Sequence, residues 1–220
     1  MRLIVISDIH GNDSLFRKAL KTISLKKTDR LVLIGDLIDR GKYSKNVLDT
    51  LFLLKNNGFE NIIYIRGNHE QMLLDAYEDE NKEYIWLKNG GDKTLQSFKV
   101  NFCDEIPNEY IQLLQSSIFY YEIDGYVFVH GGINFNVENP LEDTNSLLWT
   151  RNTSVELYRK SYLAEKKIIH GHTPVSKEDI LQQFSNIEIL NIDNGVYLDK
   201  EDFGSLTVVD LTNHKIFFVK

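Results

Sequence analysis

The stretch "RLVLIGDLIDRG", residues 30–41, joins an apolar run to a cluster of charged residues. The apolar part predicts a buried β-strand. Asp36, Asp39 and Arg40 follow within a few residues of its end. In open α/β sheets ligands bind beyond the carboxyl ends of the strands. The stretch therefore predicts both a class of fold and the place of a functional site.

Similar apolar runs recur along the chain and predict further strands at 3–7, 62–67, 126–132, 167–173 and 187–193. Helical patterns at 12–23 and 44–52 separate the first of these runs, which indicates βαβ units. Near the end, residues 205–211 and 215–220 flank a short turn and predict a hairpin. The sequence thus predicts an α/β fold with a mixed sheet. The polar segment 78–105 resembles an insertion over the core.

Composition limits the classes of protein that fit. A chain of 220 residues with 42% hydrophobic content suits one compact domain, so we expect a single domain over residues 1–220. The net charge of −7 opposes binding to a nucleic acid backbone. No run approaches the roughly 20 apolar residues of a membrane span. With one cysteine, Cys103, and no secretion signal, we expect a cytoplasmic protein.

Polar residues cluster where five of the predicted strands end. Taken singly, each has an ordinary explanation as a helix cap, a turn residue or a packed histidine. Caps do not require four imidazoles and several carboxylates at one sheet edge. Mixed imidazole and oxygen ligands suit Mn, Fe or Zn rather than Ca or an all-oxygen Mg site. The candidates are Asp8, His10, Asp36, Asp39, Arg40, Asn68, His69, Glu70, His130 and His172.

The motifs "DIHG", "GDLIDRG", "RGNHE", "HGG" and "GHT" occur in this order between residues 8 and 173. Together they resemble the calcineurin-like metallophosphoesterases, and within them the bacterial and phage Ser/Thr phosphoprotein phosphatases. The "WLKNGG" at 86–91 and the "WTR" at 149–151 are also similar to that group. The resemblance implies a four-layer α/β/β/α sandwich around two divalent metal ions. We expect Mn²⁺, with Fe or Zn as alternatives.

The resemblance also implies roles for the residues in these motifs. Two cations together can polarise a phosphoryl oxygen and acidify a bridging water for direct attack. Planar guanidinium groups suit two phosphate oxygens. The implied roles are Asp8 and His10 on the first metal, Asp36 bridging both metals, Asn68, His130 and His172 on the second, His69 as general acid oriented by Asp39, and Arg40 with Arg151 on the phosphate.

Six positions have less specific interpretations. We expect Glu70 to stabilise a helix dipole and Asp193 to hold a turn. His170, two residues before His172, is a candidate for a supporting role. Trp86 and the glycines at 90–91 fit a rim near the substrate and an ordinary turn equally well.

Three classes of function follow from these motifs. The leading prediction is a phosphomonoesterase acting on phosphoserine or phosphothreonine in proteins, with a monomer as the simplest oligomeric state. The alternative is a hydrolase of dinucleoside polyphosphates such as diadenosine tetraphosphate, whose "GIHPQW" type of stretch is replaced here by "GGINFNVENP". A binding scaffold on an inactive fold would lack a ligand, and none is missing. Some metallophosphoesterases, mostly phosphodiesterases and nucleases, carry a further histidine where this chain has Pro174, which favours the phosphatase branch.

Overall fold

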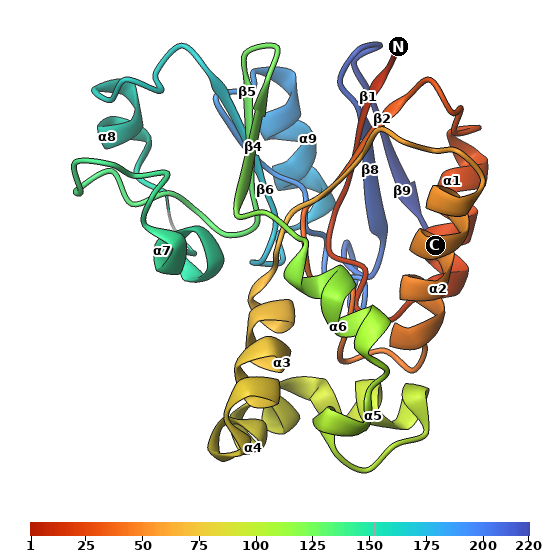
Figure 1. Cartoon of the computed structure of the whole chain (residues 1–220). Helices are drawn as coiled ribbons and strands as arrows, with labels where there is room; N and C mark the ends of the chain where they lie inside the picture. Colours follow the sequence, from red (N-terminus) through yellow and green to blue (C-terminus); the bar gives the residue numbers. More distant parts are fainter. Residues whose placement is uncertain (152) are drawn as a thin grey trace.

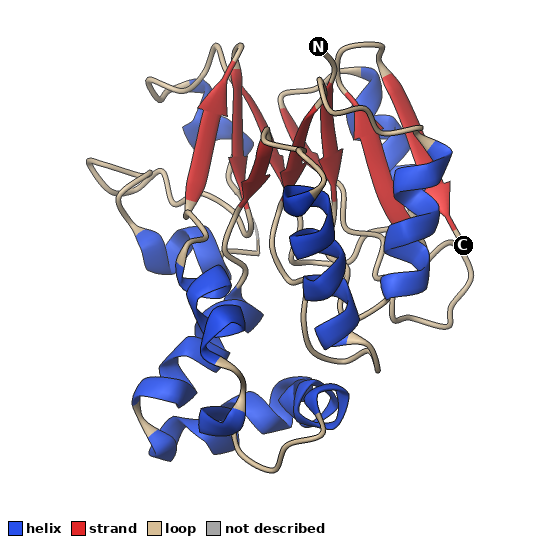
Figure 2. Cartoon of the chain, turned by 45° about the vertical axis from the view of Figure 1, so that its right-hand side comes forward, coloured by secondary structure: helices blue, strands red, loops and turns tan. Residues whose placement is uncertain are grey.

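The computed structural model describes residues 1–151 and 153–220. Two mixed sheets form its centre (Figures 1 and 2). The first sheet has the order β3-β2-β1-β8-β9. Its parallel part confirms the predicted βαβ units, and its antiparallel part confirms the predicted hairpin. The five strands are β1 (Leu3–Ile6), β2 (Arg30–Leu33), β3 (Ile62–Tyr64), β8 (Leu206–Asp210) and β9 (Lys215–Val219).

The second sheet has the order β4-β5-β6-β7, and only the β4–β5 pair is antiparallel. It comprises β4 (Tyr120–Ile123), β5 (Tyr126–Val129), β6 (Lys167–His170) and β7 (Ile189–Asn191). The sequence did not predict β4. This edge strand has exposed and half-buried side chains in alternation, so it lacks the continuous apolar run that identified the others.

Side chains alternate between the two faces of each sheet, and this alternation builds the layers. In β1, Ile4 and Ile6 face α1 (Asp13–Thr22) and α2 (Ser44–Asn56). Val5 on the same strand faces the second sheet. The outer face of the second sheet packs against α7 (Thr144–Trp149) and α8 (Val155–Arg159), while α9 (Lys177–Ser185) contributes to the core between the sheets. The predicted four-layer sandwich is therefore confirmed.

Helices between β3 and β4 form a lobe at the carboxyl ends of the first sheet's parallel strands (Figure 1). The prediction of a polar insertion over residues 78–105 is wrong in one respect, because Trp86, Leu95 and Cys103 are buried in the same core as α1 and α2. The elements are α3 (Asn68–Glu78), η1 (Glu80–Lys82), α4 (Glu83–Trp86), η2 (Leu87–Gly91), α5 (Asp92–Phe98), η3 (Cys103–Glu105) and α6 (Asn108–Gln115).

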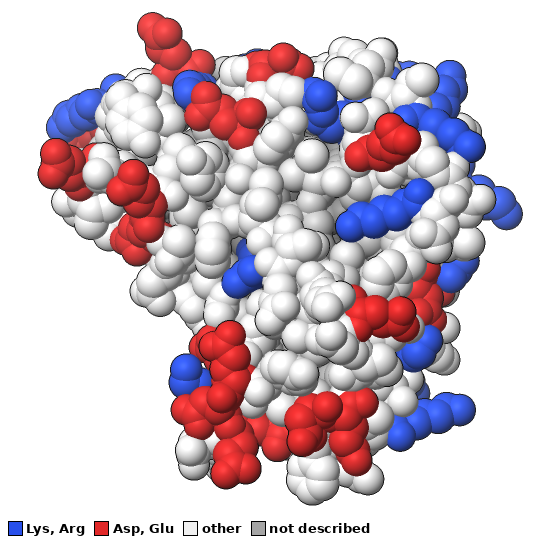
Figure 3. All heavy atoms as spheres, viewed as in Figure 1, with Lys and Arg blue, Asp and Glu red and all other residues white. Residues whose placement is uncertain are grey.

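Acidic side chains gather over the lower part of the molecule, where α3 and α4 lie (Figure 3). This surface does not attract a phosphate, so an anionic ligand has to be held by local cations. Across residues 1–151 and 153–220, no helix combines the length and the apolar character needed to cross a membrane.

Candidate metal centre

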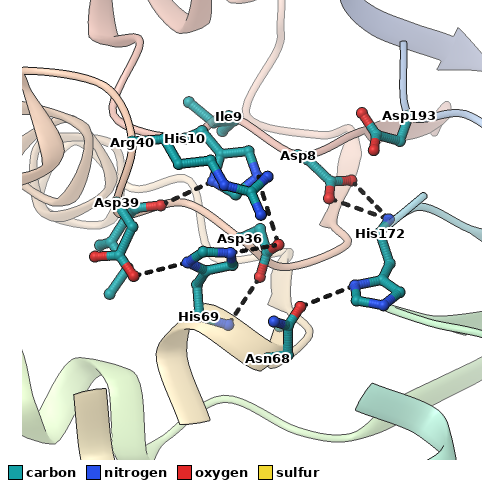
Figure 4. A network of polar contacts seen from close by, with 12 residues as sticks. Asp8, Ile9, His10, Asp36, Asp39, Arg40, Asn68, His69, His172 and Asp193 are labelled. Atoms are coloured by element: carbon teal, nitrogen blue, oxygen red, sulfur yellow. Dashed lines mark hydrogen bonds and ion pairs between the residues drawn. The ribbon is translucent and has the colours of Figure 1, made fainter. Parts of the chain in front are cut away.

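The loops that follow β1, β2, β5 and β6 and the start of α3 bring the predicted ligands to one place (Figure 4). This arrangement follows from the parallel strands, whose carboxyl ends meet at one edge. The ligand candidates are nearly inaccessible to solvent: Asp8, His10, Asp36, Asn68, His69, His130 and His172.

Asp36 lies at the centre of this cluster. Its Oδ2 is 3.5 Å from His10 Nε2 and 3.9 Å from His69 Nε2, and its Oδ1 is 3.4 Å from His130 Nε2. Within residues 1–151 and 153–220, two groups of donor atoms are compact enough to hold a cation, and Asp36 belongs to both. They are His10, Asp36 and His69, and Asp36, His130 and His172.

Asn68 connects two of the histidines. Its Oδ1 is 3.0 Å from His130 Nε2 and 2.9 Å from His172 Nδ1. His130 Nδ1 lies 2.8 Å from the carbonyl of Ile34 and donates to it, which leaves Nε2 with a lone pair. The lone pair of His130 Nε2 therefore faces Asn68 Oδ1, which is also an acceptor. Two acceptors this close repel each other, and a cation bound to both would remove the repulsion.

The protonation states also fit cation binding. Burial lowers the pKa of His172 to about 3, helped by the nearby His130, so the imidazole is neutral. Burial raises the pKa of Asp8, and the carboxylates of Asp193 and Asp36 raise it further. Neutral imidazoles beside crowded carboxylates are a donor set for divalent ions. The residues therefore fit two divalent metal ions.

Asp8 lies outside the two compact groups. Its oxygens accept the backbone N–H of His172 at 3.1 and 3.3 Å, so the carboxylate joins the loops after β1 and β6. Asp193 accepts the N–H of Gly195 at 2.7 Å, which confirms its turn role. Its position near Asp8, visible in Figure 4, was not predicted.

Asp39 orients His69. Its Oδ2 is 2.8 Å from His69 Nδ1 and accepts Trp86 Nε1–H at 2.9 Å, while its Oδ1 accepts the hydroxyl of Thr94 at 2.6 Å. Burial lowers the pKa of His69, but the charge of Asp36 and the hydrogen bond with Asp39 outweigh it, so the pKa is raised. The imidazole thus keeps its proton more readily. Thr94 gave no signal in the sequence, since an isolated threonine in a polar segment is common.

Glu70 has a different role from the predicted one. Its carboxylate accepts the backbone N–H groups of Asp36, Leu37 and Gly67, each at 2.8 Å. It therefore fixes the loop that carries Asp36 rather than only stabilising the helix dipole. Close approach requires glycine at position 67, because an added Cβ would lie 2.1 Å from Asp36 Oδ1.

The two predicted phosphate-binding arginines differ in exposure, because Arg40 is half-buried and Arg151 lies on the surface. Arg40 Nη1 is 2.9 Å from His10 Nε2, at the edge of the buried cluster. Arg151 is exposed and, together with His170, lines a hollow of about 320 Å³. Its charge contributes to the lowered pKa of His172, after burial and His130, so it borders the site. His170 belongs to neither compact group of donor atoms.

A family model described as calcineurin-like phosphoesterase matches residues 1–197. The chain belongs to this family. Among relatives of this calcineurin-like phosphoesterase, Serine/threonine-protein phosphatase 1 of Salmonella typhimurium is 44% identical over 89 residues, which are 40% of this chain and 38% of that protein. The chain therefore spans less than two fifths of that relative's length in the match.

Another relative matches over a longer range at lower identity. The Bis(5'-nucleosyl)-tetraphosphatase PrpE of a Geobacillus species is 24% identical over 213 residues, covering 86% of this chain and 85% of that protein. A protein serine/threonine phosphatase structure from Saccharomyces cerevisiae covers 99% of this chain and 78% of its own, with a TM-score of 0.71 and 17% identity. The structure of a cold-active protein tyrosine phosphatase matches with a TM-score of 0.68 and 19% identity, and the match covers 99% of this chain and 78% of that one. These structures support the fold.

Proposed function

We propose that this calcineurin-like phosphoesterase is a metal-dependent protein serine/threonine phosphatase. The observation that carries the proposal is the position of Asp36, shared by two groups of metal donors, with the His69–Asp39 pair beside it. His69 is itself a member of the first group, and we assign Asp8 in its place to the first cation, so that the cluster supplies both a place for two cations and a proton donor. The Salmonella relative supports a phosphoprotein as the substrate.

We assign Asp8, His10 and Asp36 to one metal ion and Asp36, Asn68, His130 and His172 to the other. When bound, two divalent cations supply Lewis-acid polarisation of a phosphate ester and a water acidic enough to react near neutral pH. We propose Mn²⁺ as the native ion, because imidazole and oxygen donors are mixed here. We also propose a cytoplasmic monomer.

The chain's own residues then handle the proton and the phosphate. His69 Nε2 is buried, has no hydrogen-bond partner among the described residues and faces Asp36. A protonated His69 can donate from this nitrogen to the leaving seryl oxygen, while Asp39 holds the opposite side of the ring. Arg40 and Arg151 hold the non-bridging phosphate oxygens, because a guanidinium donates two parallel hydrogen bonds.

A dinucleoside polyphosphate hydrolase is the second candidate, and the long match to PrpE favours it. Parallel turnover assays of the Mn²⁺-loaded protein on a phosphoserine peptide, a phosphotyrosine peptide and diadenosine tetraphosphate decide between the two. We expect the phosphoserine peptide to have the highest kcat/KM. Efficient cleavage of the dinucleotide alone would contradict the leading proposal.

A further inference from the structure

Tyr197 lies in the segment between β7 and β8 and contacts two residues of the site. The Arg40 Cζ atom is 4.4 Å from the centroid of the Tyr197 ring. The ring of Tyr197 also meets the His10 imidazole edge to face, with centroids 5.0 Å apart and an angle of 83° between the planes. One aromatic side chain therefore contacts both a metal-ligand candidate and a phosphate-binding candidate.

Stacking on an aromatic face restricts a guanidinium in a useful way. The ring attracts the cation, while the edge of the guanidinium, which carries its N–H donors, stays available. Arg40 has a long side chain, and its backbone is fixed by one hydrogen bond from its N–H to the carbonyl of Gly90 at 3.1 Å. The backbone contact leaves the side chain free to turn, so its orientation is limited by the Tyr197 ring together with the contact of Nη1 with His10 Nε2.

The segment that carries Tyr197 has its own supports. Asn194 Nδ2 donates to the carbonyls of Val175 and Asp202 at 3.0 and 2.7 Å, and its Oδ1 accepts the N–H of Ser205 at 3.1 Å. These hydrogen bonds hold both ends of the loop. None of them involves Tyr197, a residue that is 37% exposed, so the loop does not depend on its side chain for its conformation.

We propose that Tyr197 is a positioning residue for phosphate binding, which acts by holding the Arg40 guanidinium against its ring. This inference rests on the proposed role of Arg40 in binding the phosphate. The contact uses the face of the aromatic ring, so a phenylalanine at position 197 should keep it, whereas a leucine has no ring and should lose it. Tyr197 acts through Arg40 and not through its hydroxyl.

The test compares three variants loaded with Mn²⁺. Phe203→Leu is the matched control, because Phe203 belongs to the same loop and also pairs with a cation, Lys200, at 4.6 Å. Calorimetric titration with inorganic phosphate measures binding directly, and steady-state kinetics on p-nitrophenyl phosphate separate KM from kcat. We expect Tyr197→Leu to weaken phosphate binding and raise KM roughly threefold to fivefold with little change in kcat. Tyr197→Phe should restore phosphate affinity, and Phe203→Leu should match the parent.

Three results would overturn the inference. The first is an unchanged phosphate affinity in Tyr197→Leu. The second is an equal loss of phosphate affinity in Phe203→Leu, which would indicate a general loosening of the loop. The third is a loss of bound metal in Tyr197→Leu, which would indicate that Tyr197 supports His10 instead. Failure of the proposed function gives a different result. A parent protein that binds phosphate through Tyr197 and Arg40 but does not hydrolyse phosphoserine peptides would reject the substrate and keep the role of Tyr197.

Discussion

Left-handed backbone conformations concentrate at the site. Ten described non-glycine residues have positive φ, and half of them are site candidates, namely His10, Asp36, Asp39, Arg40 and His172. Each such residue costs on the order of 1–2 kcal/mol, so the surrounding hydrogen bonds must stabilise them. The carbonyl of Asp36 accepts the N–H groups of both Ile9 and His10, which links the loops after β1 and β2.

At the residue scale, the motifs predicted which side chains gather at the site but not how the backbone presents them. Positive φ is usually predicted from glycine or asparagine, and aspartate, histidine and arginine take these positions here. Nor could the sequence predict that Glu70 supports the Asp36 loop, because the contact joins residues more than thirty positions apart. Its position in the first turn of a helix suggested a local role.

Asp36→Asn should reduce the occupancy of both metal ions rather than one. An amide offers two cations much less negative charge than a carboxylate, and asparagine tolerates the left-handed backbone at this position. Asp124→Asn is a matched control, because Asp124 has the same φ of 50° as Asp36 but lies exposed in the turn between β4 and β5. Metal analysis of the purified variants measures the result. Full occupancy of both metal sites in Asp36→Asn would show that Asp36 is not a ligand shared by the two ions.

His69→Asn should affect substrates according to their leaving groups. A seryl oxygen needs a proton in the transition state, whereas p-nitrophenolate leaves without one. General-acid catalysis contributes roughly 10²–10⁴-fold, so we expect a loss of that order in kcat on a phosphoserine peptide and a distinctly smaller loss on p-nitrophenyl phosphate. Both metals should remain. Because His69 also belongs to a compact donor group, a lost metal would instead make it a ligand.

Arg151→Lys tests the exposed arginine. A lysine keeps the charge but cannot reproduce the two parallel hydrogen bonds of a guanidinium. We expect weaker inhibition by inorganic phosphate and a lower kcat/KM, each by about tenfold, with unchanged metal content. Arg159→Lys is the control, since Arg159, the last residue of α8, forms an exposed ion pair with Glu188 just before β7. Unchanged phosphate inhibition in Arg151→Lys would place Arg151 outside the site.

At the scale of single elements, the buried strands were predicted well, whereas the edge strand β4 and the lobe after α3 were not. Apolar runs that end in polar residues identify buried parallel strands, because such strands have no solvent-facing side. The lobe instead consists of short helices whose core-facing residues, Trp86, Leu95 and Cys103, follow no steady helical period. Its function is nevertheless visible in the structure, since Trp86 and Thr94 hold Asp39 and therefore His69.

Gly90→Ala should disturb phosphate binding from within this lobe. An added Cβ at Gly90 would lie 2.8 Å from the backbone nitrogen and 2.9 Å from the Cγ of Arg40. We expect inorganic phosphate to bind several-fold more weakly, because Arg40 must shift. Gly125→Ala is the control: Gly125 also has positive φ, at 79°, yet no atom of the described residues lies within 4 Å of an added Cβ. Both variants should lose about 1 kcal/mol of stability from backbone strain. Equal phosphate affinity in the two would show that Gly90 does not position Arg40.

At the scale of the whole molecule, the candidate metal centre joins the two sheets. His10 and Asp36 follow strands of the first sheet, and His130 and His172 follow strands of the second. The positions of the motifs at the ends of predicted strands indicated that these residues meet, but their division between two sheets is known only from the topology. The strands that lead to the site, β1 and β5, contribute Val5 and Phe128 to the core between the sheets, where both side chains are fully buried.

Metal binding should therefore raise the thermal stability of the whole chain. A cation that binds only the folded state at 100 times its Kd stabilises by about 2.7 kcal/mol, so two such ions stabilise by about 5.4 kcal/mol. For a chain of this size this corresponds to an increase in Tm of roughly 11–22 °C. Thermal unfolding with Mn²⁺ and with a chelator measures this increase. His172→Ala should reduce it to about half, because the site between the sheets is lost while the donors of the first sheet remain. The control is Asp124→Asn, which should show the full increase. If Mn²⁺ raises the Tm of His172→Ala as much as that of the parent, the stabilising ion does not bind between the two sheets.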